Sequence, residues 1–86
     1  MKVFVVTHVE VVDGDDNVIV KVFADENVAK NELNSTIKST IDAWADDPRF
    51  SDCMVKEESE NYFCIYEDGY YCQNHDICKI DEIEVR

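Results

Sequence analysis

One segment of this chain has apolar residues at the spacing of an amphipathic helix. A chain with a single such helix can adopt only a limited set of folds. The residues recur at spacings of four and three, which places them on one side of a helix: Ala29, Leu33, Ile37, Ile41 and Trp44. Asp25 can cap the start of this helix, and Pro48 biases Asp47 away from helical geometry. We therefore expect one amphipathic helix over about residues 25–46.

The segments before the helix have the composition of a β-hairpin. Lys2–Val12 is rich in Val and Phe, and a second β-branched run follows at Val18–Ala24. The residues between them, Asp13 to Asn17, are typical of a turn. Because both faces of the first run carry apolar side chains, we expect a central strand, with a loop or another subunit covering its second face.

A second hairpin is predicted after the helix and after a third strand at Cys53–Glu58. Its strands are Tyr62–Tyr66 and Tyr70–Gln73, joined by a loop in which Gly69 takes the left-handed position. This register sets Cys64 opposite Cys72, where a cross-strand disulfide is geometrically conceivable.

The last expected strand is Ile77–Val85. Its apolar residues change parity between Ile80 and Ile83, which predicts a bulge near Asp81-Glu82. The elements predict an α+β fold in the order ββαβββ, a mainly antiparallel sheet of about five strands with one long amphipathic helix packed across it. No repeat or linker divides the chain, so we expect residues 1–86 to form a single domain.

The chain is strongly acidic. Twenty acidic and eight basic residues give a net charge of −12, with −4 in residues 1–45 and −8 in residues 46–86. Direct binding of DNA or RNA is not expected, because it requires clustered Lys and Arg to displace counterions from phosphates. The acidic field would instead attract a partner protein with a basic surface, although such a charge also serves solubility.

No signal peptide or membrane span is indicated. His8 and Glu10 interrupt the N-terminal apolar run, and no small-residue cleavage site follows it. No stretch approaches the ~18 consecutive apolar residues of a membrane span. We expect a cytoplasmic protein without membrane contact.

A catalytic motif is also missing. The two histidines, His8 and His75, do not stand at a spacing typical of a nucleophile–base pair. Two glycines are too few for a phosphate-binding loop. We expect neither enzymatic activity nor a cofactor.

The cysteines offer an alternative, which is a metal-binding or thiol-redox protein. Its ligands would be Cys64, Cys72, His75 and Cys78. The gaps between the four cysteines of the chain are 11, 8 and 6 residues, unlike the close pairs of common zinc modules. In a reducing compartment, buried thiols that act as small apolar groups are the simpler interpretation.

A tyrosine-rich acidic segment is the candidate partner-binding surface, formed by Tyr62, Tyr66, Glu67, Asp68 and Tyr70. Tyrosine supplies buried area in an interface, and carboxylates steer a basic partner. Strand alternation sends Tyr62 and Tyr66 to one face, and Phe63 and Ile65 to the other, so one set can be core while the other is partly exposed. The alternative is that these tyrosines simply fill sheet positions.

The N-terminal part resembles small uncharacterised proteins of bacterial and mobile-element genomes. The resemblance rests on Lys2-Val3-Phe4-Val5-Val6-Thr7-His8, the acidic turn, the strand Val22-Phe23-Ala24 and the helix that follows. It covers about the first 40 residues and implies no activity. The leading hypothesis is therefore a non-catalytic acidic protein-interaction module of a regulatory, immunity or mobile-element accessory type. The alternatives are a structural homo-oligomer and the metal-binding or thiol-redox protein.

Overall fold

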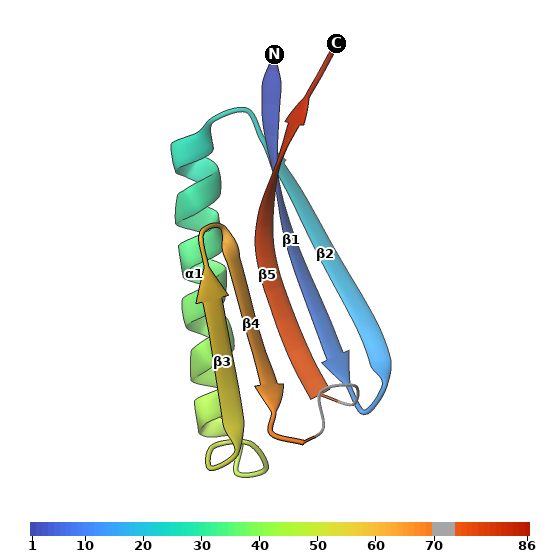
Figure 1. Ribbon diagram of the computed structural model, residues 1–86, viewed down its shortest axis with the longest axis vertical. Helices are drawn as coiled ribbons and strands as arrows, with labels where there is room; N and C mark the ends of the chain where they lie inside the picture. Colours follow the sequence, from blue (N-terminus) through green and yellow to red (C-terminus); the bar gives the residue numbers. More distant parts are fainter. Residues whose placement is uncertain (70–73) are drawn as a thin grey trace.

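Five strands and one helix make up the computed structural model, which describes residues 1–69 and 74–86. In chain order they are β1 (Lys2–Val12), β2 (Asp15–Phe23), α1 (Glu26–Asp46), β3 (Met54–Ser59), β4 (Tyr62–Glu67) and β5 (Asn74–Glu84). Neighbouring strands are antiparallel in the order β2-β1-β5-β4-β3, and α1 lies along the sheet (Figure 1). The predicted α+β fold and its ββαβββ order are confirmed.

The first hairpin turns more tightly than the sequence suggested. Val12 pairs with Asp15, so Asp13 and Gly14 alone form the turn. Both have positive φ, 52° and 87°, as in the type I′ geometry that Asp-Gly favours between antiparallel strands. The next three residues, expected in the turn, instead begin β2.

Helix α1 begins and ends as predicted. The Asp25 carboxylate accepts hydrogen bonds from the backbone N–H groups of Asn27 at 2.8 Å and Val28 at 3.3 Å. At the other end Asp47 has extended geometry, as expected before Pro48. The helix has no stretch that is long and apolar enough to cross a membrane.

Strand β5 corrects one prediction. It pairs with β1 without interruption, from Asn74 opposite Val12 to Glu84 opposite Lys2, so the bulge predicted near Asp81-Glu82 is absent. In this regular register Ile83 faces away from the core and stays 47% exposed.

The neighbours of β4 correct a second prediction. Strand β4 forms its hairpin with β3, through a turn at Glu60-Asn61, and its other neighbour is β5. Cys64 therefore lies opposite Ile77 on β5 and not opposite Cys72, because both edges of β4 are occupied by other strands. The predicted strand Tyr70–Gln73 lies outside the described residues.

The hydrophobic core fills the space between α1 and one face of the sheet. Its buried members are Phe4, Val6, Ala29, Leu33, Trp44, Phe50, Phe63, Ile65, Cys78 and Ile80. Phe63 and Ile65 of β4 face this core, as the predicted alternation allowed, and Cys64 on the other face of the strand is also buried. The two termini lie side by side, where the N–H of Val85 donates to the carbonyl of Met1 at 2.7 Å.

Candidate functional site

A cleft of about 470 Å³, lined by both polar and apolar side chains, lies between α1, β1 and β5. The sheet side of the cleft presents His8, Glu10, Asn74 and Asp76, and the helix side presents Ser35, Thr36, Ser39, Thr40 and Trp44. Serine and threonine are shorter than the leucine and phenylalanine of the core. The helix and sheet therefore leave space between them here.

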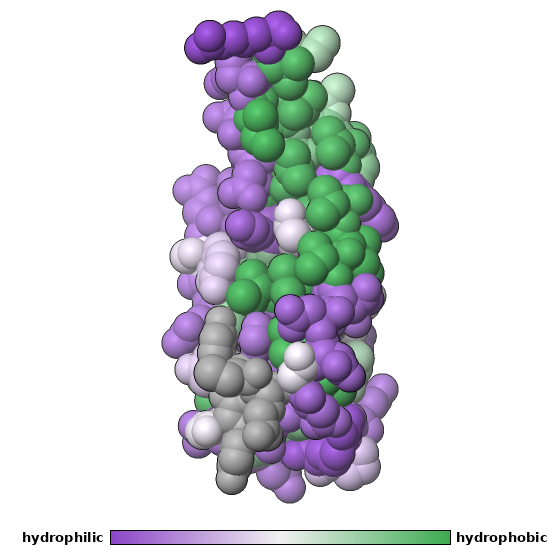
Figure 2. All heavy atoms as spheres, turned by 90° about the vertical axis from the view of Figure 1, so that its right-hand side faces the viewer, coloured by the Kyte–Doolittle hydropathy of each residue, from purple (hydrophilic) through white to green (hydrophobic). Residues whose placement is uncertain are grey.

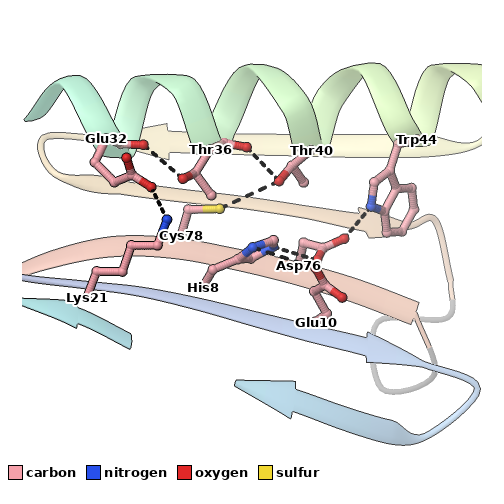
Figure 3. A network of polar contacts seen from close by, with 9 residues as sticks. All are labelled: His8, Glu10, Lys21, Glu32, Thr36, Thr40, Trp44, Asp76 and Cys78. Atoms are coloured by element: carbon pink, nitrogen blue, oxygen red, sulfur yellow. Dashed lines mark hydrogen bonds and ion pairs between the residues drawn. The ribbon is translucent and has the colours of Figure 1, made fainter. Parts of the chain in front are cut away.

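Three ionisable side chains meet on the sheet side of this cleft (Figure 3). His8 and Glu10 are two residues apart on β1 and so share a face, and Asp76 lies directly opposite Glu10 on β5. His8 Nε2 is 2.9 Å from Asp76 Oδ1, and His8 Nδ1 is 3.7 Å from Glu10 Oε1. The His8 and Asp76 side chains are only 14% and 13% exposed, so water screens their interaction weakly.

Trp44 fixes the other oxygen of the Asp76 carboxylate. Its indole Nε1–H donates to Asp76 Oδ2 at 2.5 Å. The indole ring also packs on Phe50, with ring centroids 4.5 Å apart. Because one carboxylate oxygen faces Trp44 and the other faces His8, the orientation of Asp76 is determined by both α1 and β1.

The pKa of His8 is raised from 6.5 to about 10. The main cause is the hydrogen bond to Asp76, with a further contribution from the Cys78 side chain, while burial opposes the shift. The raised pKa favours the protonated imidazole, and His8 and Asp76 form a partly buried ion pair.

The hydroxyl groups of the helix side bond to the helix itself. Thr36 and Thr40 each donate to a carbonyl one turn earlier, of Glu32 and Thr36 respectively, at 2.8 Å. Thr40 Oγ1 also lies 3.9 Å from Cys78 Sγ. Beyond them, Lys21 of β2 pairs with Glu32 at 2.6 Å, so polar contacts connect α1 with β2 and β5 (Figure 3).

The sheet face opposite α1 is a second candidate site, which we call the free face. Strand alternation places on it the aliphatic side chains of Val3, Val5, Val9, Val18, Val20, Val22, Ile77 and Ile83. Val18, Val20 and Val22 are 57%, 55% and 61% exposed. Within residues 1–69 and 74–86, no helix or strand packs on this face. Figure 2 views the molecule from the β2 side and shows hydrophobic side chains gathered in one band.

The sheet divides the predicted tyrosine-rich surface. Tyr62 and Tyr66 of β4 lie on the free face and are partly exposed. Glu67 is on the opposite face, where it accepts a hydrogen bond from Asn74 Nδ2 at 2.9 Å. Asp68 is exposed directly after β4, and Tyr70 lies outside the described residues.

Cys64 and Cys78, the two described cysteines considered as metal ligands, lie on opposite faces of the sheet. Cys78 is buried on the α1 side of the sheet, whereas Cys64 is opposite Ile77 and so is directed toward the free face. His75 shares the face of Cys64, and Cys72 lies outside the described residues. One ion cannot bind both Cys64 and Cys78, because the sheet lies between them.

The cleft was not predicted from the sequence. His8 and Glu10 are visible in the sequence as two polar residues, spaced two apart, within an apolar strand, and that spacing signals a shared polar face. Asp76 follows His8 by 68 residues and Trp44 by 32, so only the packing of β5 and α1 brings them together.

Comparison with protein-family models, curated proteins and solved structures finds no match for this chain. A functional hypothesis therefore depends on the cleft and the free face.

Proposed function

We propose that this chain is a non-catalytic protein-interaction module whose free face binds a partner with basic and apolar side chains. The observation that carries the proposal is the aliphatic surface left uncovered by the described elements. Covering apolar surface stabilises proteins by about 25 cal/mol per Å². A folded chain that leaves such a surface in water commonly uses it as a contact site.

The aliphatic part of the free face has the size of the centre of an interface. Three strands about 4.8 Å apart and seven residues with a rise of about 3.3 Å cover roughly 14 by 23 Å. This footprint of about 300 Å² also contains Thr7, Lys79 and Asp81, so the aliphatic side chains occupy only part of it. A standard interface uses about 800 Å² of each partner, so the polar surroundings would contribute the remainder.

The charges around this surface favour a basic partner. Alternation places Asp16, Glu57 and Asp81 on the free face. The lysine on the described part of this face, Lys79, lies 3.4 Å from the Asp81 carboxylate and is offset by it. Two carboxylates and the chain's net charge of −12 would therefore steer a basic surface toward the aliphatic centre.

The same charge argues against a second copy as the occupant. Two molecules that each carry −12 repel one another, and added salt weakens this repulsion. Added salt also weakens the attraction of a basic partner. Salt should therefore strengthen a homodimer and weaken the proposed complex.

Tyr62 and Tyr66 enlarge the proposed surface toward β3. They lie on β4, on the same face as Ile77 of the neighbouring β5. Partly exposed tyrosines combine apolar area with a hydroxyl and often anchor interfaces. The proposed binding surface therefore includes Tyr62 and Tyr66 of the predicted tyrosine-rich surface. It does not include Glu67, which lies on the opposite face of the sheet.

A double Val20→Thr/Val22→Thr variant tests the surface. Threonine keeps the β-branched shape that suits a strand but replaces an apolar methyl group with a hydroxyl. A buried methylene-sized group contributes about 0.8 kcal/mol. Two such losses, with the cost of burying hydroxyls, should weaken binding by about 2 kcal/mol, or roughly thirtyfold. Val28→Thr on α1 is the matched control, because Val28 is 48% exposed and lies outside the free face.

Tagged proteins would be incubated with cytoplasmic extract of the source cells and washed at rising salt. A basic protein should be retained by the wild type and by Val28→Thr, lost from the double variant and released by salt. Equal retention by all three proteins would refute the surface. A dimer in sedimentation that becomes tighter with salt would refute the basic partner and support the homo-oligomer.

A further inference from the structure

We propose that His8, Glu10 and Asp76 bind a divalent transition-metal ion such as Zn²⁺ at the sheet side of the cleft. One potential ligand atom from each residue lies within 4.8 Å of the other two. An imidazole nitrogen with two carboxylate oxygens is a donor set that zinc and related ions accept. The site is independent of the proposed function, because the free face is on the other side of the sheet.

The ligand atoms are near enough for a metal site to form after side-chain rotation. Zinc binds nitrogen and oxygen at 2.0–2.2 Å, so ligand atoms of a tetrahedral site are about 3.4 Å apart. His8 Nε2 to Asp76 Oδ1 is 2.9 Å, and His8 Nδ1 to Glu10 Oε1 is 3.7 Å. These two contacts use different ring nitrogens of His8, and an ion binds only one of them. Binding would therefore require the imidazole or a carboxylate to rotate, starting from ligand atoms that all lie within 4.8 Å of one another.

The backbone brings two like charges together at this place. Glu10 and Asp76 are direct cross-strand partners on β1 and β5. Like charges directly opposite one another destabilise a sheet unless a cation lies between them. The His8 imidazole lies beside both carboxylates, 3.7 Å from Glu10 Oε1 and 2.9 Å from Asp76 Oδ1. A divalent ion would supply twice the charge of a protonated imidazole while using the deprotonated imidazole as a ligand.

Trp44 supplies the hydrogen bond that orients a metal-binding carboxylate. Metal-binding carboxylates are usually oriented by a hydrogen bond to the oxygen that does not bind the ion. The Trp44 indole N–H donates to Asp76 Oδ2, which leaves Oδ1 directed toward His8. Figure 3 shows the indole and the imidazole on opposite sides of this carboxylate.

Three protein ligands leave at least one coordination position for water or a bound molecule. All three residues line the cleft of about 470 Å³, so this position has room for an exogenous ligand. Ser39 and Thr40 line the same cleft from α1. A small oxygen-bearing molecule on the ion would therefore meet hydroxyl groups of the helix.

Titration with Co²⁺ tests the site through two optical signals. Its d–d absorption reports coordination, and it quenches tryptophan fluorescence at short range. Trp44 is the only tryptophan of the chain and contacts Asp76, so its quenching reports this site. We expect saturation at one equivalent and reversal by Zn²⁺.

Three variants locate the ion. Glu10→Gln and His8→Gln each remove one ligand. His75→Gln is the matched control, because His75 is the other histidine of the chain and lies on the free face, away from the cleft. Even the loss of a residue that only hydrogen-bonds to a ligand commonly lowers metal affinity 10- to 100-fold. Loss of a direct ligand should therefore lower Co²⁺ affinity at least about tenfold, while His75→Gln leaves it unchanged.

Several outcomes would overturn the proposal. They are missing optical signals at excess Co²⁺, unchanged affinity in Glu10→Gln, or equal loss in His75→Gln. Thiolate-to-cobalt charge-transfer absorption that disappears in Cys64→Ser would assign the ion to the cysteines instead. If circular dichroism shows that His8→Gln is unfolded, Glu10→Gln decides, because the Glu10 side chain is 39% exposed.

Discussion

Truncating Ile65 and Ile83 to alanine applies one chemical change to the two faces of the sheet. Ile65 on β4 is 0% exposed beneath α1, whereas Ile83 on β5 is 47% exposed on the free face. The difference between the two losses of stability shows whether the free face is open to solvent in solution, as the proposed function requires. This experiment can be done before the partner is identified.

The expected losses differ severalfold. Removing a fully buried isoleucine side chain and leaving a cavity costs about 2–5 kcal/mol, and the close-packed surroundings of Ile65 favour about 3 kcal/mol. Ile83 keeps nearly half of its surface in water and loses few contacts when truncated, so we expect less than about 1 kcal/mol. Since 86 residues correspond to a total stability of roughly 4–13 kcal/mol, Ile65→Ala should remove a large fraction of it.

Urea unfolding followed by circular dichroism measures both losses. With a slope of about 1 kcal/mol per molar urea, the midpoint should fall by about 3 M for Ile65→Ala. For Ile83→Ala it should fall by less than about 1 M. In a thermal melt, each kcal/mol corresponds to about 4–8 °C in a domain of this size.

Equal losses in the two variants would refute the open free face. Repeating the measurement at several protein concentrations would then identify the cover. A loss in Ile83→Ala that depends on concentration would indicate a second copy. A loss independent of concentration would indicate a segment of the same chain.

Three further predictions concern His8, the Asp25 cap of α1 and the turn at Gly14. In metal-free protein, the His8 contribution to stability should be complete below pH 6.5 and should disappear as the pH rises through about 10, because folding raises the pKa of His8. Urea midpoints across this range should fall less in Asp76→Asn, and identical profiles would contradict the ion pair. Asp25→Ala should cost about 1 kcal/mol and reduce helical circular dichroism, because two backbone N–H groups lose their acceptor. Gly14→Ala should also destabilise by about 1 kcal/mol at a φ of 87°, and a gain in its urea midpoint would contradict the type I′ turn.

Local sequence patterns determined the secondary structure and the fold class. The apolar spacing, the Asp25 cap and Pro48 were enough to predict α1, because each acts within a few residues. Alternation within β4 likewise separated Phe63 and Ile65 from their neighbours on the other face. Strand-like segments on both sides of a single helix then left an α+β sheet as the simplest way to bury the apolar residues.

Tertiary structure decided strand neighbours, register and both candidate sites. A period of two shows which residues of one strand share a face, but it carries no information on which strand lies beside it or at what offset. For this reason the sequence alone placed Cys64 opposite Cys72 and put a bulge in β5. The pairing of β5 with β1 brings Asp76 opposite Glu10, and the position of α1 adds Trp44 to that pair. The same packing of α1 against one face of the sheet leaves Val18, Val20, Val22 and Ile83 of the other face exposed, because the described residues include no second layer to cover them.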